Sequence, residues 1–222
     1  MGEMLPLFPL GAVLFPQMVL PLHIFEDRYR QLVRDLLGRP EPRRFGVIAI
    51  REGRETGTHG VRSLYQIGCT ATLRRVHQRP DGRFDLLTVG TQRFRLIRLE
   101  QPLPYLRAEI EPLPDDEPDP AAAAPAVRGV KDAFRGYLDA LTERGGATVR
   151  LEGLPDSPAL VSFIVAAAMV IDLPERQRLL AQPDTLSRLE ALRGLLSRET
   201  AMLRTTTSRP APDLRHAPYN PN

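Results

Sequence analysis

The sequence predicts an α+β protein with an N-terminal β pseudo-barrel that carries one short helix, followed by an all-α helical subdomain. Residues 45–111 contain short runs of alternating apolar and polar side chains with turn signals between them, which is typical of a closed or nearly closed antiparallel sheet. Residues 126–203 instead carry apolar side chains at the three- and four-residue spacing of helices.

The stretch between these two regions changes composition. It is acidic, then rich in proline and alanine, as linkers between domains often are. We therefore expect a barrel domain over residues 1–113, a linker over 114–125, a helical subdomain over 126–204 and a disordered tail over 205–222.

The first extended region is interrupted by prolines at positions 6, 9, 16 and 21. Because proline cannot donate to a sheet ladder, this region does not look like an ordinary central strand. It predicts short extended pieces that turn around Pro16-Gln17. The expected pieces are Leu5–Phe8, Val13–Phe15 and Val19–Leu22.

An amphipathic helix is expected directly after these pieces. Its apolar stripe has the i, i+3, i+4, i+7, i+8 spacing of one helix face. Glu26 and Asp27 lie in its first turn, where negative charge suits the helix dipole, and Gly38 follows as a left-handed stop. We expect this helix to cover an open end of the barrel. The stripe consists of Tyr29, Leu32, Val33, Leu36 and Leu37.

The remaining strands of the barrel are bounded by turn signals. Asp81-Gly82 is the strongest hairpin signal in the chain, and residues 51–63 are polar and glycine-rich, which predicts a surface loop. The expected strands are Phe45–Ile50, Leu64–His77 with a bend at Gly68, Phe84–Val89, a further strand through Phe94–Arg98, and Leu106–Glu111.

Four helices are expected in the second half. Ser157-Pro158 and Asp184 are start signals, since Ser and Asp cap helices and proline suits the first helical position. The second of these helices is apolar nearly all round, so it should lie at the centre of the subdomain. The predicted helices are Ala126–Arg144, Pro158–Ile171, Glu175–Ala181 and one from Asp184 to about Leu203.

Composition limits the class of protein. The chain has 222 residues and a net charge of +3, divided as 17 basic and 12 acidic residues in 1–112 against 13 and 15 in 113–222. This asymmetry is too weak to demand a nucleic-acid or membrane partner. A single cysteine, Cys69, suits a reducing compartment, and the first 22 residues lack the basic residue of a signal peptide. We expect a soluble cytoplasmic protein.

Several separated motifs resemble those of one known family, in the order in which the family has them. They are LPLFPL, VLFPQMVLPLHIFEDRYRQLV, FGVIAI, DGRFDLLTVGTQRFRLI, PYLRAEIEPLPDDE and DLPERQRLLAQPDTLSRLEALRGLL, and together they span about residues 5–200. This pattern is similar to the N-terminal substrate-binding domain of Lon proteases. The resemblance implies a pseudo-barrel of the PUA-like type, a following helical segment, and a role in recognising proteins.

The chemistry of a complete Lon protease is not expected from these residues. A phosphate-binding loop needs glycines before a lysine that is followed by Ser or Thr, and a Ser–Lys dyad needs a lysine with a lowered pKa. Lys131 is the only lysine, and Asp132 follows it. The four histidines show no metal-ligand spacing, so neither a metal nor a cofactor is expected. We expect a non-catalytic, free-standing recognition module.

The leading hypothesis is binding of unfolded or client polypeptides, with an ATP-dependent protease as a further partner. Such binding needs an exposed apolar surface rimmed by charge. The predicted site lies at the proline turn and the helix start; the alternative is that the same apolar side chains only plug the barrel end. A groove between barrel and helical subdomain is a second candidate, and the oligomeric state stays open. The site residues are Phe15, Met18, His23, Phe25, Glu26 and Arg28.

A second hypothesis is an RNA-binding module that uses the arginine-rich hairpin 74–98, because PUA-like folds also bind RNA. Interleaved acidic residues and sparse aromatic residues favour a solvated surface over this reading. The arginines concerned are Arg74, Arg75, Arg79, Arg83, Arg93, Arg95 and Arg98.

Overall fold

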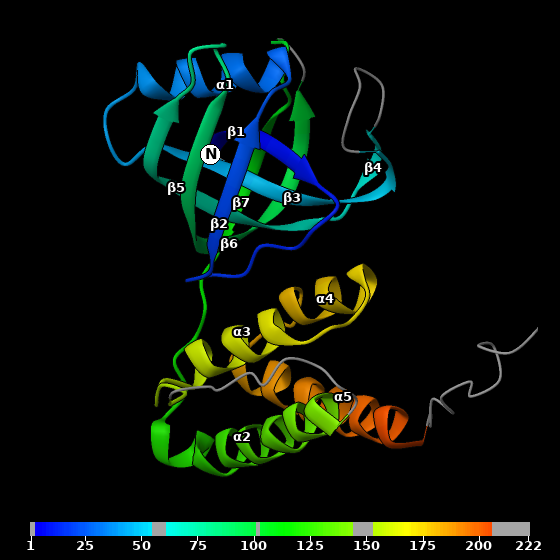
Figure 1. The fold of residues 1–222 in the computed structure, drawn as a ribbon. Coiled ribbons are helices and arrows are strands. Elements are labelled where there is room, and N and C mark those ends of the chain that lie inside the picture. Colours follow the sequence, from blue (N-terminus) through cyan, green and yellow to red (C-terminus); the bar gives the residue numbers. More distant parts are fainter. Residues whose placement is uncertain (1–2, 55–60, 101–102, 144–152, 206–222) are drawn as a thin grey trace, which may run out of the picture.

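The computed structural model describes residues 3–54, 61–100, 103–143 and 153–205, which form a barrel and a helical subdomain (Figure 1). The strands are β1 (Glu3–Leu10), β2 (Val19–Ile24), β3 (Arg44–Gly53), β4 (Val61–Leu64), β5 (Ile67–Gln78), β6 (Phe84–Glu100) and β7 (Arg107–Leu113). The helices are α1 (Asp27–Leu37), α2 (Pro120–Glu143), α3 (Pro158–Ala168), α4 (Leu173–Leu180) and α5 (Thr185–Thr205).

The sheet closes on itself. Its strand order is β1-β7-β6-β5-β3-β4, and a parallel pairing of β1 with β3 joins the two sides. All other pairings are antiparallel. Closure removes most free strand edges, which makes the barrel a self-contained unit. The predicted α+β class and the β pseudo-barrel are thus confirmed.

β1 is a barrel strand despite its prolines, which corrects the expectation from their spacing. Its first half, residues 3–6, pairs with β7, and its second half, residues 7–10, pairs with β3. Each half therefore uses mainly one edge, so the missing N–H groups of Pro6 and Pro9 do not interrupt a two-sided ladder.

The expected extended piece Val13–Phe15 does not form a strand; these residues belong to the connection between β1 and β2, which turns at Pro16-Gln17. The turn reaches back to the sheet: the N–H of Gln17 donates to the carbonyl of Gly90 over 2.8 Å. β2 then pairs with the first half of β6 and not with β1. The N-terminal pieces are therefore separate barrel strands and not a hairpin.

α1 covers one end of the barrel, as predicted (Figure 1). Its side chains Tyr29, Leu32, Val33 and Leu36 are buried against a cluster that includes Phe8 and Phe45. Burial of such side chains stabilises the fold by roughly 1.5–3 kcal/mol each before entropy losses. Gly38 does follow the helix, but with φ of −75°, so the predicted left-handed stop is wrong.

Two predictions for this part of the barrel change in detail, and one is confirmed. The expected loop 51–63 contains the end of β3 and the first three residues of β4, 61–63, while residues 55–60 lie outside the described part. The two expected strands after the hairpin are one, β6. The hairpin at Asp81-Gly82 is confirmed, and Gly82 has φ of +79°, which glycine adopts without strain.

α2 begins at Pro120, six residues before the predicted start at Ala126. Proline suits a first helical position, and the N–H of Ala121 donates to the Asp119 carboxylate over 3.1 Å. Pro125 inside the helix removes one backbone hydrogen bond, which is why the sequence reads as a linker up to that point.

The other helices follow their sequence signals. α3 is buried on most sides and lies among the other helices, as predicted, although it ends at Ala168 and not at Ile171. The predicted cap of α5 is confirmed, because Asp184 accepts a hydrogen bond of 2.7 Å from the N–H of Ser187. None of the helices in the described ranges is long and apolar enough to cross a membrane.

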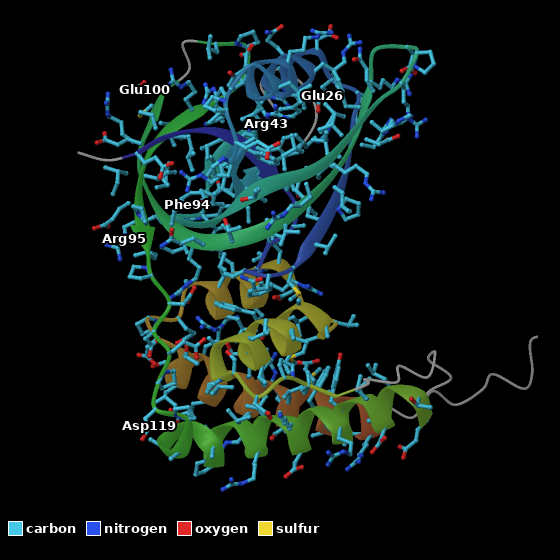
Figure 2. All side chains as sticks on the ribbon, turned by 90° about the vertical axis from the view of Figure 1, so that its left-hand side faces the viewer. Glu26, Arg43, Phe94, Arg95, Glu100 and Asp119 are labelled. Carbon is cyan, nitrogen blue, oxygen red and sulfur yellow. The ribbon has the colours of Figure 1, made fainter. Side chains whose placement is uncertain are left out.

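The barrel and the helical subdomain share one apolar cluster. Phe15, from the turn before β2, packs against Phe163 of α3 with ring centroids 6.3 Å apart. The amide of Gln177 donates to the carbonyl of Ile67 over 2.8 Å, joining α4 to β5. The helices therefore cover the end of the barrel opposite α1, and Figure 2 shows this order from the side, with Asp119 at the far end.

Candidate functional site

The six predicted site residues separate into two groups. Phe15 and Met18 lie at the end of the barrel that faces the helices. Phe15 is only 1% exposed, and Met18 packs against both the barrel core and the shared cluster. Phe15 plugs the barrel end, which agrees with the alternative to a binding role. Phe15 is therefore no part of an exposed surface, because the helical subdomain covers it.

The other predicted residues gather at the opposite end, beside α1. His23, Phe25 and Glu26 border a hollow of about 150 Å³ between the ends of β1 and β2 and the start of α1. Phe25 is 52% exposed although it is a large aromatic residue. We call this hollow the β1–β2 hollow. The residues that line it are Phe8, Pro9, Leu10, Leu22, His23, Ile24, Phe25, Glu26 and Tyr29.

Charged side chains fix one wall of the β1–β2 hollow. His23 Nδ1 lies 2.7 Å from Oδ1 of Asp85, and Nε of Arg79 donates to Oδ2 of the same carboxylate over 2.7 Å. These hydrogen bonds, first from His23 and then from Arg79, hold the pKa of Asp85 below its usual range. The His23 ring stacks beside Phe25 at a centroid distance of 6.2 Å. The wall thus presents aromatic surface in a set orientation.

Arg28 borders a second hollow, of about 370 Å³, which the sequence reasoning did not find. Arg28 Nη2 lies 3.0 Å from Glu26 Oε2, so this ion pair separates the two hollows. We call the second one the β4–β6 hollow. The only sequence signal for it was the apolar pair Ile97 and Leu99, which breaks the alternation of β6. Its lining residues are Arg28, Val61, Arg62, Ser63, Leu64, Leu99, Glu100 and Leu106.

The arginines of the RNA hypothesis do not form one cationic surface. Arg79, Arg83, Arg95 and Arg98 each form an ion pair with a nearby carboxylate. Arg93 is buried, where its guanidinium donates to the carbonyls of Leu180 and Gln182. Arg74 and Arg75 are exposed, and within the described ranges neither has a carboxylate partner.

A largely buried charge cluster lies between the barrel and the helices, where the second candidate groove was expected. Asp115 lies 2.8 Å from Nε of Arg93 and 3.5 Å from Nη2 of Arg188. Burial raises the pKa of Asp115 and lowers that of Arg188 to about 10, in the latter case together with repulsion from Arg93. The Arg188 guanidinium also lies 4.0 Å above the Phe163 ring.

The Cys69 thiol is buried, and the Lys131 ammonium is held by nearby oxygen atoms. Burial raises the pKa of the Cys69 thiol, which keeps it protonated and unreactive. Lys131 Nζ donates to the carbonyl of Leu154 over 3.4 Å and lies 3.7 Å from Asp156. Within the part of the chain that the structure covers, no three His, Cys, Asp or Glu side chains are grouped to hold a metal ion.

Comparison with known proteins identifies the family. Residues 4–198 match the model of the ATP-dependent protease La (LON) substrate-binding domain. The chain is 29% identical over 202 residues to Lon protease 2 of Herpetosiphon aurantiacus, a match that covers 90% of this chain and 24% of that protein. The chain thus spans about a quarter of the length of the curated relatives it matches.

Solved structures agree in fold. The crystal structure of a Lon N-terminal domain protein from Xanthomonas campestris is 28% identical, with a TM-score of 0.59 over 88% of this chain and 98% of that one. The N-terminal domain of the Lon protease from the Mycobacterium avium complex has a TM-score of 0.62 over the same shares at 17% identity, which shows the fold alone.

Proposed function

The chain belongs to the family of Lon substrate-binding domains, and on this premise we propose that it captures unfolded or client polypeptides without catalysing a reaction itself. The domain is a substrate-recognition module by family. We place the capture surface at the β1–β2 hollow, around His23, Phe25 and Glu26, with Arg28 at its border. The cytoplasm, where Cys69 stays reduced, is the proposed location.

The exposure of Phe25 carries this proposal. When a partner covers a half-exposed aromatic side chain, apolar surface is removed from water, and this stabilises the complex. Phe25 stands between His23, which is hydrogen-bonded to Asp85, and the Glu26–Arg28 ion pair, so an apolar centre has polar and charged neighbours. Recognition surfaces often combine an aromatic anchor with such a polar rim.

Binding of reduced, carboxymethylated α-lactalbumin, a permanently unfolded polypeptide, tests the proposal. The Phe25→Asp variant should bind it at least about tenfold more weakly, because a charge replaces the aromatic anchor. Val170→Asp is the matched control, since Val170 is an exposed apolar residue of the helical subdomain, 72% exposed. Equal binding by wild type and Phe25→Asp would remove the β1–β2 hollow from consideration, and no binding by wild type would refute the function.

Delivery of the captured polypeptide to an ATP-dependent protease is the partner relationship that family membership supports. Addition of the chain to a purified ATP-dependent protease should change the degradation rate of the unfolded polypeptide. The Phe25→Asp variant should not change it. If the wild-type chain leaves the degradation rate unchanged, delivery to the protease is refuted, while capture of the polypeptide is not.

RNA binding is kept as a second candidate because Arg74 and Arg75 are exposed without carboxylate partners in the described ranges. Binding through them should fall steeply with salt and should disappear in an Arg74→Ala, Arg75→Ala double variant. Binding of a 20-nucleotide single-stranded RNA that is weak at low salt, or the same in the double variant, would end this candidate.

A further inference from the structure

The β4–β6 hollow lies where two neighbouring strands separate. The N–H of Leu96 donates to the carbonyl of Gln66 over 2.8 Å, and this is where the contact of β6 with the β4–β5 segment ends. Beyond that bond, among the residues that the structure describes, β4 pairs only with β3 and the last residues of β6 pair only with β7. Both pairs contain register shifts, which bend strands locally. Two strand edges thus face one hollow.

We propose that this hollow binds an extended polypeptide segment as an added β-strand, paired with the edge of β4 that no described strand occupies. The inference rests on the proposed function and names the way in which a client would be held. Strand addition gives affinity through main-chain hydrogen bonds and so accepts many sequences, as recognition of varied clients requires. In Figure 2 the labelled Glu26 and Glu100, one from each hollow, both lie at the end of the barrel away from the helices.

The backbone of β4 supports this pairing. Tyr65 donates its N–H to the carbonyl of Ala49 on β3, and Leu64 stands opposite Ile50 in the register. Because successive residues of a strand direct their N–H and C=O groups to opposite edges, those of Leu64 point away from β3. The Leu64 side chain lines the hollow. A strand that enters the hollow would therefore meet a donor and an acceptor.

Exposed apolar residues occur close in sequence to the β6 end that borders the hollow. Ile97, Leu99 and Leu103 are three of the large apolar residues that remain exposed, and they lie within seven positions of one another. Leu99 lines the hollow and is 45% exposed. Alternate side chains of an added strand would cover this surface.

The charges of the hollow specify the occupant. Arg28 is paired with Glu26, and Glu100 is paired with Arg98. Arg62 lines the hollow and is exposed, and in the described part of the chain it has no carboxylate partner. The Ser63 hydroxyl is buried there without a hydrogen bond. An extended apolar segment with one acidic residue would supply both the carboxylate and polar main-chain groups.

The probe is a nine-residue peptide of alternating valine and threonine with a central glutamate, labelled for fluorescence anisotropy. Wild type should bind it, and the Leu99→Asp variant should bind at least about tenfold more weakly because charge enters the apolar surface. Leu186→Asp, a matched change at an α5 leucine that is 42% exposed, should bind as wild type does. The Arg62→Glu variant should lose more affinity for this peptide than for a version in which glutamine replaces the central glutamate.

Two N-methylated versions of the peptide distinguish strand addition from side-chain docking. In each version, N-methyl groups at alternate residues remove the N–H donors along one edge of the extended peptide. At least one version should lose about tenfold or more in affinity, since N-methylation removes the donors of that edge. The Leu64 amide should exchange its hydrogen more slowly when the unmodified peptide is bound. Equal affinity of all three peptides, or no binding by wild type, would overturn the inference.

The same measurements separate this inference from the proposed function. Capture of unfolded α-lactalbumin that depends on Phe25 but not on Leu99 would leave the function standing and refute strand addition. A second copy of the chain is another possible occupant of the strand edge. If light scattering shows a dimer that Leu99→Asp dissociates, the edge serves self-association and the inference is refuted.

Discussion

The Nε atom of Arg93 lies 2.8 Å from Oδ1 of Asp115, although the Arg93 side chain is only 2% exposed. Arg93 comes from the barrel strand β6, and Asp115 comes from the segment that leads to α2. Its neighbour Asp116 accepts a hydrogen bond of 2.9 Å from the N–H of Thr185, at the start of α5. The predicted linker is therefore fastened on both sides, which holds the barrel and the helices in one arrangement.

The Asp115→Asn variant should lower the free energy of unfolding by about 3 kcal/mol, because it removes the carboxylate that forms ion pairs with both buried guanidinium groups, those of Arg93 and Arg188. This is the lower end of the usual range, since the Asp115 side chain keeps 18% exposure. Urea denaturation monitored by circular dichroism measures the change. Glu111→Gln is the control, as Glu111 is exposed and lies 3.8 Å from Arg95; an equal loss in both variants would contradict the role of the joint.

Gly68 lets the Phe94 ring occupy the barrel interior. A Cβ atom at Gly68 would lie 2.4 Å from Cζ of Phe94 and 2.7 Å from the Val47 carbonyl oxygen. Gly68→Ala should therefore destabilise the fold by about 1–3 kcal/mol. Gly136→Ala in α2 meets no atom within 4 Å and should stabilise by about 0.4–1 kcal/mol, so thermal unfolding of the pair should shift in opposite directions. Shifts of the same sign would argue against this packing.

Tyr105 fastens α1 to the barrel. Its hydroxyl donates to the Asp35 carboxylate over 2.6 Å, and burial, together with this bond, raises the pKa of Tyr105 to about 12. An unfolded tyrosine ionises near 10, so the unfolded state loses its proton first and stability should fall as pH rises from about 10 to 12.

The Tyr105→Phe variant should lose about 1.5–3 kcal/mol at neutral pH, the usual range for a hydrogen bond to a charged group. It should also lack the Tyr105 contribution to alkaline destabilisation. Unfolding free energies at pH 8 and pH 11 for both proteins test this. A variant that loses as much stability as wild type between those two pH values would show that Tyr105 does not cause the loss.

Asp184 caps α5, and hydrogen bonds from the N–H and hydroxyl of Ser187 lower its pKa below the ordinary value of 3.8. A lowered pKa in the fold gives stability above pH 3.8 that is lost as pH falls through the lowered value. Asp184→Ala should cost about 1 kcal/mol at pH 7, as caps usually do. The difference from wild type should shrink in acid; a constant difference down to pH 2 would contradict a carboxylate cap.

Local patterns predicted the elements whose cause lies in neighbouring residues. The stripe of α1, the turn at Asp81-Gly82 and the cap at Asp184 all depend on spacing or on one residue type, and each is confirmed. The family motifs supplied the barrel as a whole. The start of α2 was wrong because Pro125 breaks helices in general, while buried contacts along α2 compensate for the bond it removes here.

For the candidate site, too, some features follow from the sequence and others only from the tertiary structure. The sequence alone determined that apolar residues are frequent between Phe15 and Phe25, because the residue types of a short segment can be read directly from it. Only the tertiary structure decided that Phe15 is covered by α3 while Phe25 stays exposed beside α1, since the turn at Pro16 sends the two residues to opposite ends of the barrel. The β4–β6 hollow also exists only in three dimensions, because strand divergence depends on which partners β4 and β6 find across the sheet.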